Sequence, residues 1–298
     1  WGMSNQVKCA AFDLSLRWLL MIGVCNFSTG RELMLNKIVS VGFVIGLAAQ
    51  ANAATYTIVT SLDGSQGWTS STQNAGTADL TDLTGTGGNL ENNAPLPSGA
   101  VKLTTASDNS DKATVALLGN FGTVADIIDS DFSLSYNWYD MAGSGSAAPS
   151  IKMAFYDVTY TGDNYGQLIF EPYWQQSGDA LKGDWVNSTI SLSSGVTWTT
   201  GMFGVSNSFG GPPNKTLTDW LTVFASDFGD AYLVGISIGI GTYNNNETGY
   251  FDKVSILGTD NDGSWDFQVA AVPLPAGLPL LAAGLGLLGW AGRKKRRD

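Results

Sequence analysis

The chain has 298 residues, of which 26 are acidic and 15 are basic, for a formal net charge of −11 at neutral pH. Between Ala54 and Ala271 it has six lysines, no arginine and 23 acidic residues, a net charge of −17, so we expect no nucleic-acid partner. The two cysteines are Cys9 and Cys25, and histidine is absent. Disulfides, cysteine-ligated metals and His-dependent catalytic triads are therefore excluded from residue 54 onward.

The N-terminal region contains a predicted secretory signal peptide at residues 34–53. A short n-region with Lys37 precedes an apolar run at 38–49, and Ala51 and Ala53 satisfy the A-x-A rule for cleavage by signal peptidase. The apolar run is too short to span a bilayer. The mature chain is therefore expected to start near Ala54.

Residues 1–33 are a doubtful upstream extension. They open on Trp1 rather than Met and carry a second apolar run. We favour an upstream translation that is not part of the native protein, and a cytoplasmic extension is the alternative.

Short runs of alternating apolar and polar residues dominate the sequence from Tyr56 to Leu257. In "DFSLSYNWY" the alternation places Phe132, Leu134, Tyr136 and Trp138 on one face, as in a half-buried strand. The pattern recurs in "SIKMAFYDV" (Ile151, Met153, Phe155), "AYLVGISIGIG" (Val234, Ile236, Ile238, Ile240) and "GYFDKVSIL" (Tyr250, Val254, Ile256), and further candidates are "AVKLTT", "KATVALL", "QLIFEPYW" and "VNSTISL". Residues 54–258 are therefore predicted to be all-β, an antiparallel β-sandwich of the jelly-roll or concanavalin-like type.

One helix, two loops and a spacer complete this expected domain organisation. "TLTDWLTVFASDF" places Leu217, Trp220, Leu221 and Phe224 at helical spacing behind a Thr cap, so it predicts a helix that covers one end or face of the sandwich. Residues 64–99 and 207–214 are rich in Gly and Asn and are expected to be long loops. Residues 259–271 are expected to be a spacer.

Glu171 is the candidate catalytic residue. Glycoside hydrolysis needs two carboxyl groups facing each other across a cleft. Glu171 lies between Phe170 and "PYW", where burial would raise the pKa of a carboxyl group. The favoured alternative is a solvent-facing residue on a strand.

Trp174, Trp185 and Tyr173 are candidate sugar-stacking residues. Together with Trp198 they lie in a span rich in Gln, Asn and Asp, and aromatic rings can stack on the apolar faces of sugars. The favoured alternative is that these rings fill the core of the sandwich.

Calcium is the one cofactor that the sequence suggests. "DNDGSWD" places Asp260, Asp262 and Asp266 close together, and oxygen ligands at nearly alternate positions can wrap one Ca²⁺. "SDNSD" and "DSD" are similar acidic loops, and none completes an EF-hand. Solvated turns are the favoured alternative.

The C-terminal segment at 272–298 differs from everything before it. It combines "VPLPA", an apolar segment at 277–292 and a basic cluster; the motif is Val272, Pro273, Leu274, Pro275 and Ala276, and the cluster is Arg293, Lys294, Lys295, Arg296 and Arg297. As a helix the apolar segment would reach roughly 24 Å, and the preceding uncharged residues from Ala270 make a membrane span feasible. The basic cluster would then stay in the cytoplasm, with the acidic domain outside.

This arrangement resembles the PEP-CTERM sorting signal of exported proteins of Gram-negative bacteria, in its VPLPA variant. The resemblance covers about 27 residues and implies recognition by an exosortase, a membrane protease thought to cleave near the motif. The domain itself looks like the uncharacterised β-sandwich domains that accompany this signal, on the stretches "LTTASDNSDKATVAL", "LSYNWYD", "LIFEPYWQQSGDALKGDWV", "LTDWL" and "GYFDKVSIL". The last is similar to the closing strand of many carbohydrate-binding jelly rolls.

The sequence leaves three functions open. We expect an exported protein, transiently anchored in the inner membrane by its C-terminal helix, that meets signal peptidase and exosortase and ends at the cell surface or in the extracellular polysaccharide. There it would be a non-enzymatic structural or adhesive component. The alternatives are a carbohydrate-binding module that uses Trp174 and Trp185, and a polysaccharide-cleaving enzyme that uses Glu171.

Overall fold

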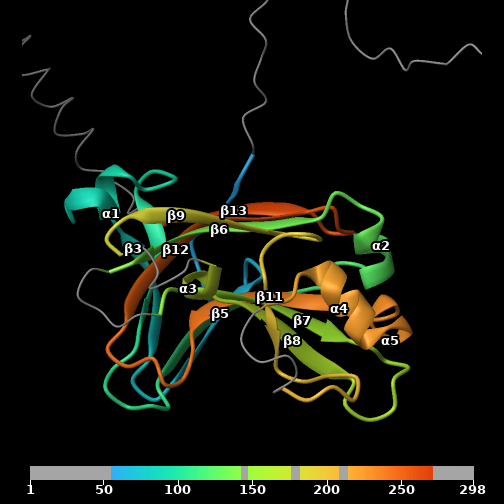
Figure 1. Cartoon of the computed structure of the whole chain (residues 1–298). Helices are drawn as coiled ribbons and strands as arrows, with labels where there is room; N and C mark the ends of the chain where they lie inside the picture. Colours follow the sequence, from blue (N-terminus) through green and yellow to red (C-terminus); the bar gives the residue numbers. More distant parts are fainter. Residues whose placement is uncertain (1–54, 142–146, 176–181, 208–213, 271–298) are drawn as a thin grey trace, which may run out of the picture. The chain divides into compact units, whose positions relative to one another are not determined.

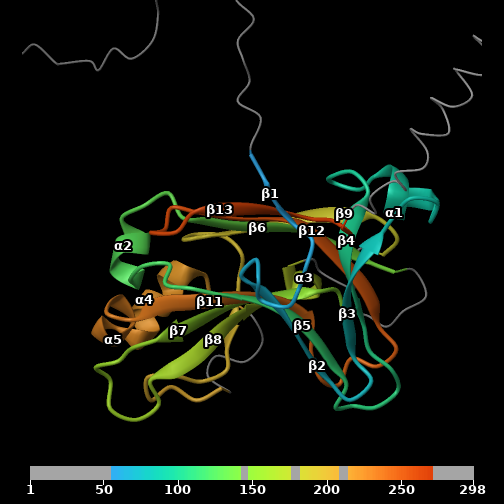
Figure 2. The same cartoon turned by 180° about the vertical axis from the view of Figure 1, so that it is seen from behind.

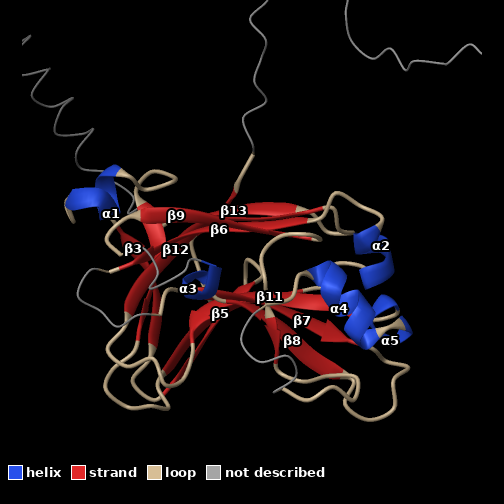
Figure 3. Cartoon of the chain, in the orientation of Figure 1, coloured by secondary structure: helices blue, strands red, loops and turns tan. Residues whose placement is uncertain are grey.

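The alternating runs form the strands of two stacked β-sheets in the computed structural model, which describes residues 55–141, 147–175, 182–207 and 214–270 (Figure 1). The predicted signal peptide, the residues before it and the sorting signal at 272–298 lie outside the described residues. Within the described ranges, no helix has the length and apolar character needed to cross a membrane. The prediction of a β-sandwich is confirmed, and the described residues add four short helices to the one that was predicted (Figure 3).

The first layer is a seven-stranded sheet. Its strands lie in the order β1-β13-β12-β4-β3. β4 and β13 share one edge of β12, and β6 pairs with the opposite edge of β12 along most of its length and with β9. The strands are β1 (Thr57–Val59), β3 (Thr77–Asp82), β4 (Gly99–Thr104), β6 (Ser133–Asp140), β9 (Trp185–Ser191), β12 (Thr248–Leu257) and β13 (Gly263–Phe267).

The second layer is a six-stranded sheet in the order β10-β8-β7-β11-β5-β2, with every pair antiparallel. Its strands are β2 (Trp68–Gln73), β5 (Lys112–Leu118), β7 (Ser150–Tyr156), β8 (Tyr165–Phe170), β10 (Trp198–Thr199) and β11 (Tyr232–Ile240). Figure 2 shows β5 and β2 sloping away on one side of β11, and β7 and β8 on the other.

The core lies between the two sheets, where the apolar face of each strand is removed from water. Three of its largest side chains are Trp68, Trp138 and Trp220, each at most 1% exposed. Two of their indole N–H groups donate hydrogen bonds inside the core, Trp138 Nε1 to Ser188 Oγ at 2.9 Å and Trp220 Nε1 to Thr197 Oγ1 at 2.8 Å. Trp68 instead packs edge-on against Phe267, with ring centroids 5.0 Å apart.

Five short helices are described: α1 (Gly88–Asn92), α2 (Val124–Ile128), α3 (Pro172–Gln175), α4 (Leu217–Phe224) and α5 (Ser226–Gly229). In Figures 1 and 2, α2, α4 and α5 gather at one end of the sandwich. The predicted helix is α4, and it starts at a capping box in which Asp219 N donates to Thr216 Oγ1 and the Asp219 carboxylate accepts from Thr216 N. Its buried face, with Trp220 and Phe224, packs into the core.

Two segments expected to be loop or spacer contain strands. Residues 64–99 hold β2, α1 and β3, because the fully buried Trp68 anchors β2 beside β5 and Leu80 of β3 pairs with Val101 of β4. Residues 259–271 hold β13, whose Phe267 is fully buried. The sandwich therefore extends past residue 258, and its β1–β13 pair is parallel rather than antiparallel.

Local irregularities correct three finer predictions. A β-bulge at Val234 breaks the expected alternation, so the preceding Leu233 faces the core. A second bulge at Lys253 separates Val254 from Phe251, which takes the core position expected for Tyr250. The end of "QLIFEPYW" is the helix α3 rather than strand, because a strand is hard to continue through Pro172.

Candidate functional site

Strand β11 presents almost no side chains on the outer face of the six-stranded sheet. Its isoleucines at alternate positions face the core, and the positions between them, continued by the residue after the strand, are Gly235, Ser237, Gly239 and Gly241. At Gly239 a β-carbon would lie 2.4 Å from the carbonyl oxygen of Ala113, so this position accepts only glycine without a shift of the backbone. From Gly235 to Gly241 the outward positions hold only glycine and one serine, and between neighbouring strands with larger side chains they leave a trench.

Two adjoining hollows, of about 450 and 230 Å³, form this trench. Lys112 of β5, Lys152 of β7 and Gln167 of β8 line both of them, so the two hollows are continuous. The larger one extends past Gly241 to the loop that carries Tyr243. We call the two hollows together the trench.

A row of exposed tyrosines lies at one end of the trench. Tyr232, Tyr156 and Tyr165 are direct cross-strand neighbours on β11, β7 and β8. Tyr165 is 48% exposed and lines the smaller hollow, and its hydroxyl accepts a hydrogen bond from Gln167 Nε2 at 3.1 Å. As cross-strand neighbours the three tyrosines share one face of the sheet, where a flat, partly apolar ligand can cover them.

Aromatic residues also surround the other end. Trp198 of β10 pairs with Ile169 of β8 and shares its outward face. Tyr243 is 79% exposed at the rim, and Tyr173 of α3 lines the wall. The trench therefore has aromatic rings at both ends and polar or charged groups between them.

Glu171 lies in the wall of the larger hollow, directly after β8. Its carboxylate accepts a hydrogen bond from the Tyr173 hydroxyl at 3.1 Å. Burial raises the pKa of Glu171, and the tyrosine, the neighbouring Trp198 indole and the charge of Lys152 act in the opposite direction. The Trp198 Nε1 approaches this carboxyl group without a hydrogen bond of normal geometry.

The trench lacks the carboxylate pair of a glycosidase among the residues described. Glu171 is the one acidic residue in the lining of the two hollows within the described part of the chain. General acid catalysis together with a nucleophile or a base needs a second carboxyl group across the cleft. In the described part of the chain, Glu171 is a hydrogen-bonding group in the wall of the trench.

The structure does not bring the predicted stacking residues together in one groove. Trp174 is 44% exposed, lies outside the lining of the trench and packs against Tyr173, with ring centroids 5.3 Å apart. Trp185 belongs to the seven-stranded sheet, where its ring packs on Tyr139 and its Nε1 donates to Leu90 O at 2.9 Å. Of the three predicted residues, Tyr173 alone lines the trench.

The three aspartates predicted to hold calcium are separate in their contacts. Asp262 Oδ1 accepts from Thr259 N at 2.8 Å and closes a turn. Asp266 lies on β13 and accepts from Gln268, while the carboxylate of Asp260 lies beside Gly122. Within the described residues, no group of three or more acidic side chains could hold a metal ion.

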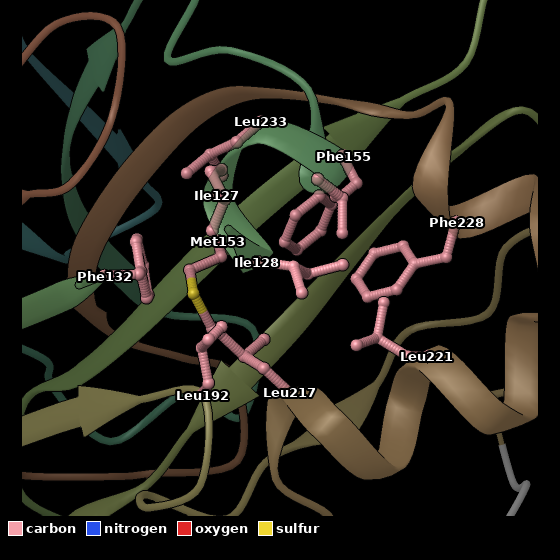
Figure 4. Close-up of a pocket in the computed structure, with 11 residues that line it drawn as sticks. Ile127, Ile128, Phe132, Met153, Phe155, Leu192, Leu217, Leu221, Phe228 and Leu233 are labelled. Atoms are coloured by element: carbon pink, nitrogen blue, oxygen red, sulfur yellow. The ribbon is translucent and has the colours of Figure 1, made fainter. Parts of the chain in front are cut away.

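A separate apolar hollow lies between α2, α4, α5 and the inner face of the six-stranded sheet (Figure 4). Its volume is about 10 Å³, which is at the lower limit for a single water molecule. Met153, Phe155, Leu217 and Phe228 point into it from the sheet and the helices. This hollow is a packing gap of the core and not a ligand site.

The sequence analysis did not identify Lys152, Tyr156 and Tyr165 as site residues. For the first two, the alternating pattern of the strand already indicated an outward side chain. The alternation in "SIKMAFYDV" that sends Ile151, Met153 and Phe155 inward sends Lys152 and Tyr156 outward. "GISIGIG" likewise shows glycine or serine at each outward position of one strand. What the sequence alone could not show is that these two strands are adjacent.

No family model and no curated protein matches the chain. Among solved structures it is similar to the family 11 carbohydrate-binding module from Clostridium thermocellum, with 12% identity, a TM-score of 0.36, and 68% of this chain and 93% of that chain covered. It is similar to the xylan-binding domain CBM22-1 of Paenibacillus barcinonensis Xyn10C, with 12% identity and a TM-score of 0.30. The match covers 64% of this chain and 85% of that chain. It is also similar to a β-1,2-glucanase from Parabacteroides distasonis, with 15% identity and a TM-score of 0.34. The match covers 70% of this chain and 24% of that chain.

Proposed function

We propose that the sandwich binds an extended polysaccharide along the trench. The observation that carries this proposal is the bare outer face of β11, which runs from the tyrosine row to the aromatic residues beyond Gly241. From Tyr232 to Gly241 this path is about 30 Å long at roughly 3.3 Å per residue. A path of this length accommodates several sugar units in a row.

The lining suits sugars in both its apolar and its polar groups. Sugar rings present C–H faces that stack on tyrosine and tryptophan, and the exposed Tyr165 and Tyr243 offer such surfaces at the two ends. Sugar hydroxyl groups need donors and acceptors, which Gln167 and Glu171 supply between the ends. The trench therefore contains both kinds of contact that hold a carbohydrate chain.

We propose binding without cleavage, as an adhesive or matrix component. The single carboxylate in the described lining supports this reading over hydrolysis, which needs two. A strongly acidic domain also stays soluble in a concentrated extracellular matrix because its copies repel one another.

We further propose that the protein is exported and sorted to the cell surface or the extracellular polysaccharide. The signal-like segment at 34–53, the "VPLPA" motif, the apolar segment after it and the basic cluster at 293–297 support this proposal. In this account the jelly-roll-like sandwich is the mature module, the N-terminal signal helix is removed by signal peptidase, and the C-terminal helix anchors the chain until an exosortase acts on it.

A blocked trench tests the binding proposal. A β-carbon at Gly241 would have one neighbour within 4 Å, Asn244 Nδ2 at 4.0 Å, so Gly241→Leu fills the trench without a backbone clash. Gly229→Leu is the matched control, because a β-carbon at Gly229 meets nothing within 4 Å and the residue lies on α5, outside the trench lining. Affinity electrophoresis of the full chain against a panel of neutral and acidic polysaccharides measures the effect.

We expect the wild-type chain and Gly229→Leu to be retarded by the same polysaccharides and Gly241→Leu to run freely. Equal retardation of both variants would place the binding surface elsewhere. Free migration of the wild-type chain in every polysaccharide would refute the proposed function.

A further inference from the structure

Lys152 is the most unusual charged residue of the trench. It lies on the outward face of β7, is only 8% exposed and lines both hollows. Within the described ranges it makes no hydrogen bond and no ion pair. The side chain is largely withdrawn from water and its ammonium lines the trench, so this lysine is placed to pair with an anionic group of a ligand that fills the trench.

A second lysine lines the trench. Lys112 of β5 lines the same two hollows, and its charge acts on Lys152 across the trench. Burial, with a smaller contribution from Lys112, lowers the pKa of Lys152 to about 8, while Glu171 raises it. Near neutral pH the ammonium form of Lys152 therefore still predominates.

The trench differs in charge from the rest of the domain. Residues 54–271 contain six lysines and 23 acidic residues, yet two of the six lysines and one carboxylate make up the charged groups of the described lining. Elsewhere the domain repels a polyanion, whereas the described lining of the trench carries a net charge of +1. Electrostatic complementarity of this kind selects one class of ligand over another.

Taken with the proposed function, on which this inference rests, we propose that the polysaccharide in the trench is acidic. The carboxylate of a uronic acid unit pairs with Lys152 Nζ at the centre, and Lys112 supports it from the opposite wall. Glu171 and its partner Tyr173 contact hydroxyl groups of a neighbouring unit. Stacking on the aromatic residues at both ends then holds the polysaccharide, and the two lysines give the trench its preference for an acidic one.

Two hexasaccharides that differ only in their acidic groups test this preference. Mannohexaose and the hexamer of β-1,4-linked mannuronate share ring and linkage, and the second has a carboxylate where the first has a hydroxymethyl group. Isothermal titration of the full chain with each, at pH 6.5 and low salt, gives both affinities. We expect the wild-type chain to bind the mannuronate hexamer about tenfold more tightly, the effect of one good charge pair.

Three variants separate the preference from binding itself. Lys152→Met keeps the length of the side chain and is expected to bring the two affinities within about threefold of each other, with mannohexaose binding retained. Glu171→Gln removes the negative charge of the lining and is expected to strengthen binding of the mannuronate hexamer. Lys102→Met on β4, in the other sheet, is the matched control and is expected to change neither affinity.

The outcomes distinguish this inference from the proposed function. If the wild-type chain binds mannohexaose as tightly as the mannuronate hexamer, or if Lys152→Met leaves a tenfold preference intact, the acidic ligand is refuted while the trench remains a sugar site. If neither hexasaccharide binds, both proposals fail for this class of chain. An equal loss of both affinities in Lys152→Met would show a structural role for the lysine and would also overturn the inference.

Discussion

Asp252 is a buried acid whose ionisation opposes folding. It lies on β12 with an exposed fraction of 0%, and its Oδ1 accepts a hydrogen bond from Phe267 N at 3.0 Å. Its Oδ2 has no hydrogen-bond partner among the described residues. Burial, with a smaller contribution from the charge of Asp266, raises the pKa of Asp252 from 3.8 to about 7.

The size of the effect follows from this shift. Each pKa unit corresponds to about 1.4 kcal/mol, so the ionised form of Asp252 costs the folded state on the order of 4 kcal/mol. The sign follows from the direction of the shift. Because the folded pKa is raised, the contribution of Asp252 to the free energy of unfolding is fully present below the unfolded pKa of 3.8. It is lost as the pH rises through the folded pKa of about 7.

Asp252→Asn removes this dependence while keeping the shape and the acceptor for Phe267 N. Replacing the carboxyl hydroxyl with an amide also changes the free energy of unfolding by an amount that does not depend on pH. The informative quantity is therefore how the difference in free energy of unfolding between variant and wild type changes with pH. We expect the free energy of unfolding of the variant, relative to wild type, to rise by on the order of 4 kcal/mol from pH 4 to pH 8.

Urea unfolding of the full chain at pH 4, 6 and 8, followed by the fluorescence of the buried tryptophans, measures this difference. Stability profiles of the two proteins that run parallel over the whole range would refute the argument. They would show that Asp252 ionises in the folded chain as easily as in the unfolded one.

Three further predictions follow from the fold, the trench and the tail. Tyr165→Ala should weaken polysaccharide binding by about 5- to 30-fold, the effect of losing one exposed aromatic contact, whereas Leu257→Ala on the other sheet should not, and titration against the same glycan decides. Thr216→Ala should lower the free energy of unfolding by about 1 kcal/mol because it removes the cap of α4, and Thr216→Ser should restore most of it; equal stability of Ala and Ser variants would contradict the cap. Mass spectrometry of the exported chain should find it without residues 293–297, and recovery of that basic cluster would count against sorting by cleavage.

Many strands of the sandwich were predictable because they carry a two-residue alternation. "DFSLSYNWY" sends Leu134, Tyr136 and Trp138 inward, and all three are fully buried. α4 was predictable for a similar reason, since its apolar residues recur at helical spacing behind Thr216. Local periodicity is sufficient for such elements, because each strand or helix must turn one apolar side to the core.

The parts that the sequence could not predict depend on contacts between distant residues. Nothing local shows that β13 returns to pair with β12 and β1, or that Trp185 packs beside α1 on the other sheet. The trench is of the same kind. Its floor is readable in "GISIGIG", but its charge comes from Lys112 and Lys152, which meet only because β5 and β7 flank β11.

The indole N–H signals of the tryptophans test the central claim most directly. Trp198 lines the trench, whereas Trp185 lies on β9 of the other sheet and its Nε1 donates a hydrogen bond to Leu90 O of α1, so the two report on different surfaces. We predict that adding mannuronate hexamer to the ¹⁵N-labelled full chain shifts the Trp198 signal, assigned through a Trp198→Phe variant, and leaves the Trp185 signal in place. A shift of Trp185 with Trp198 unchanged would contradict a polysaccharide site in the trench.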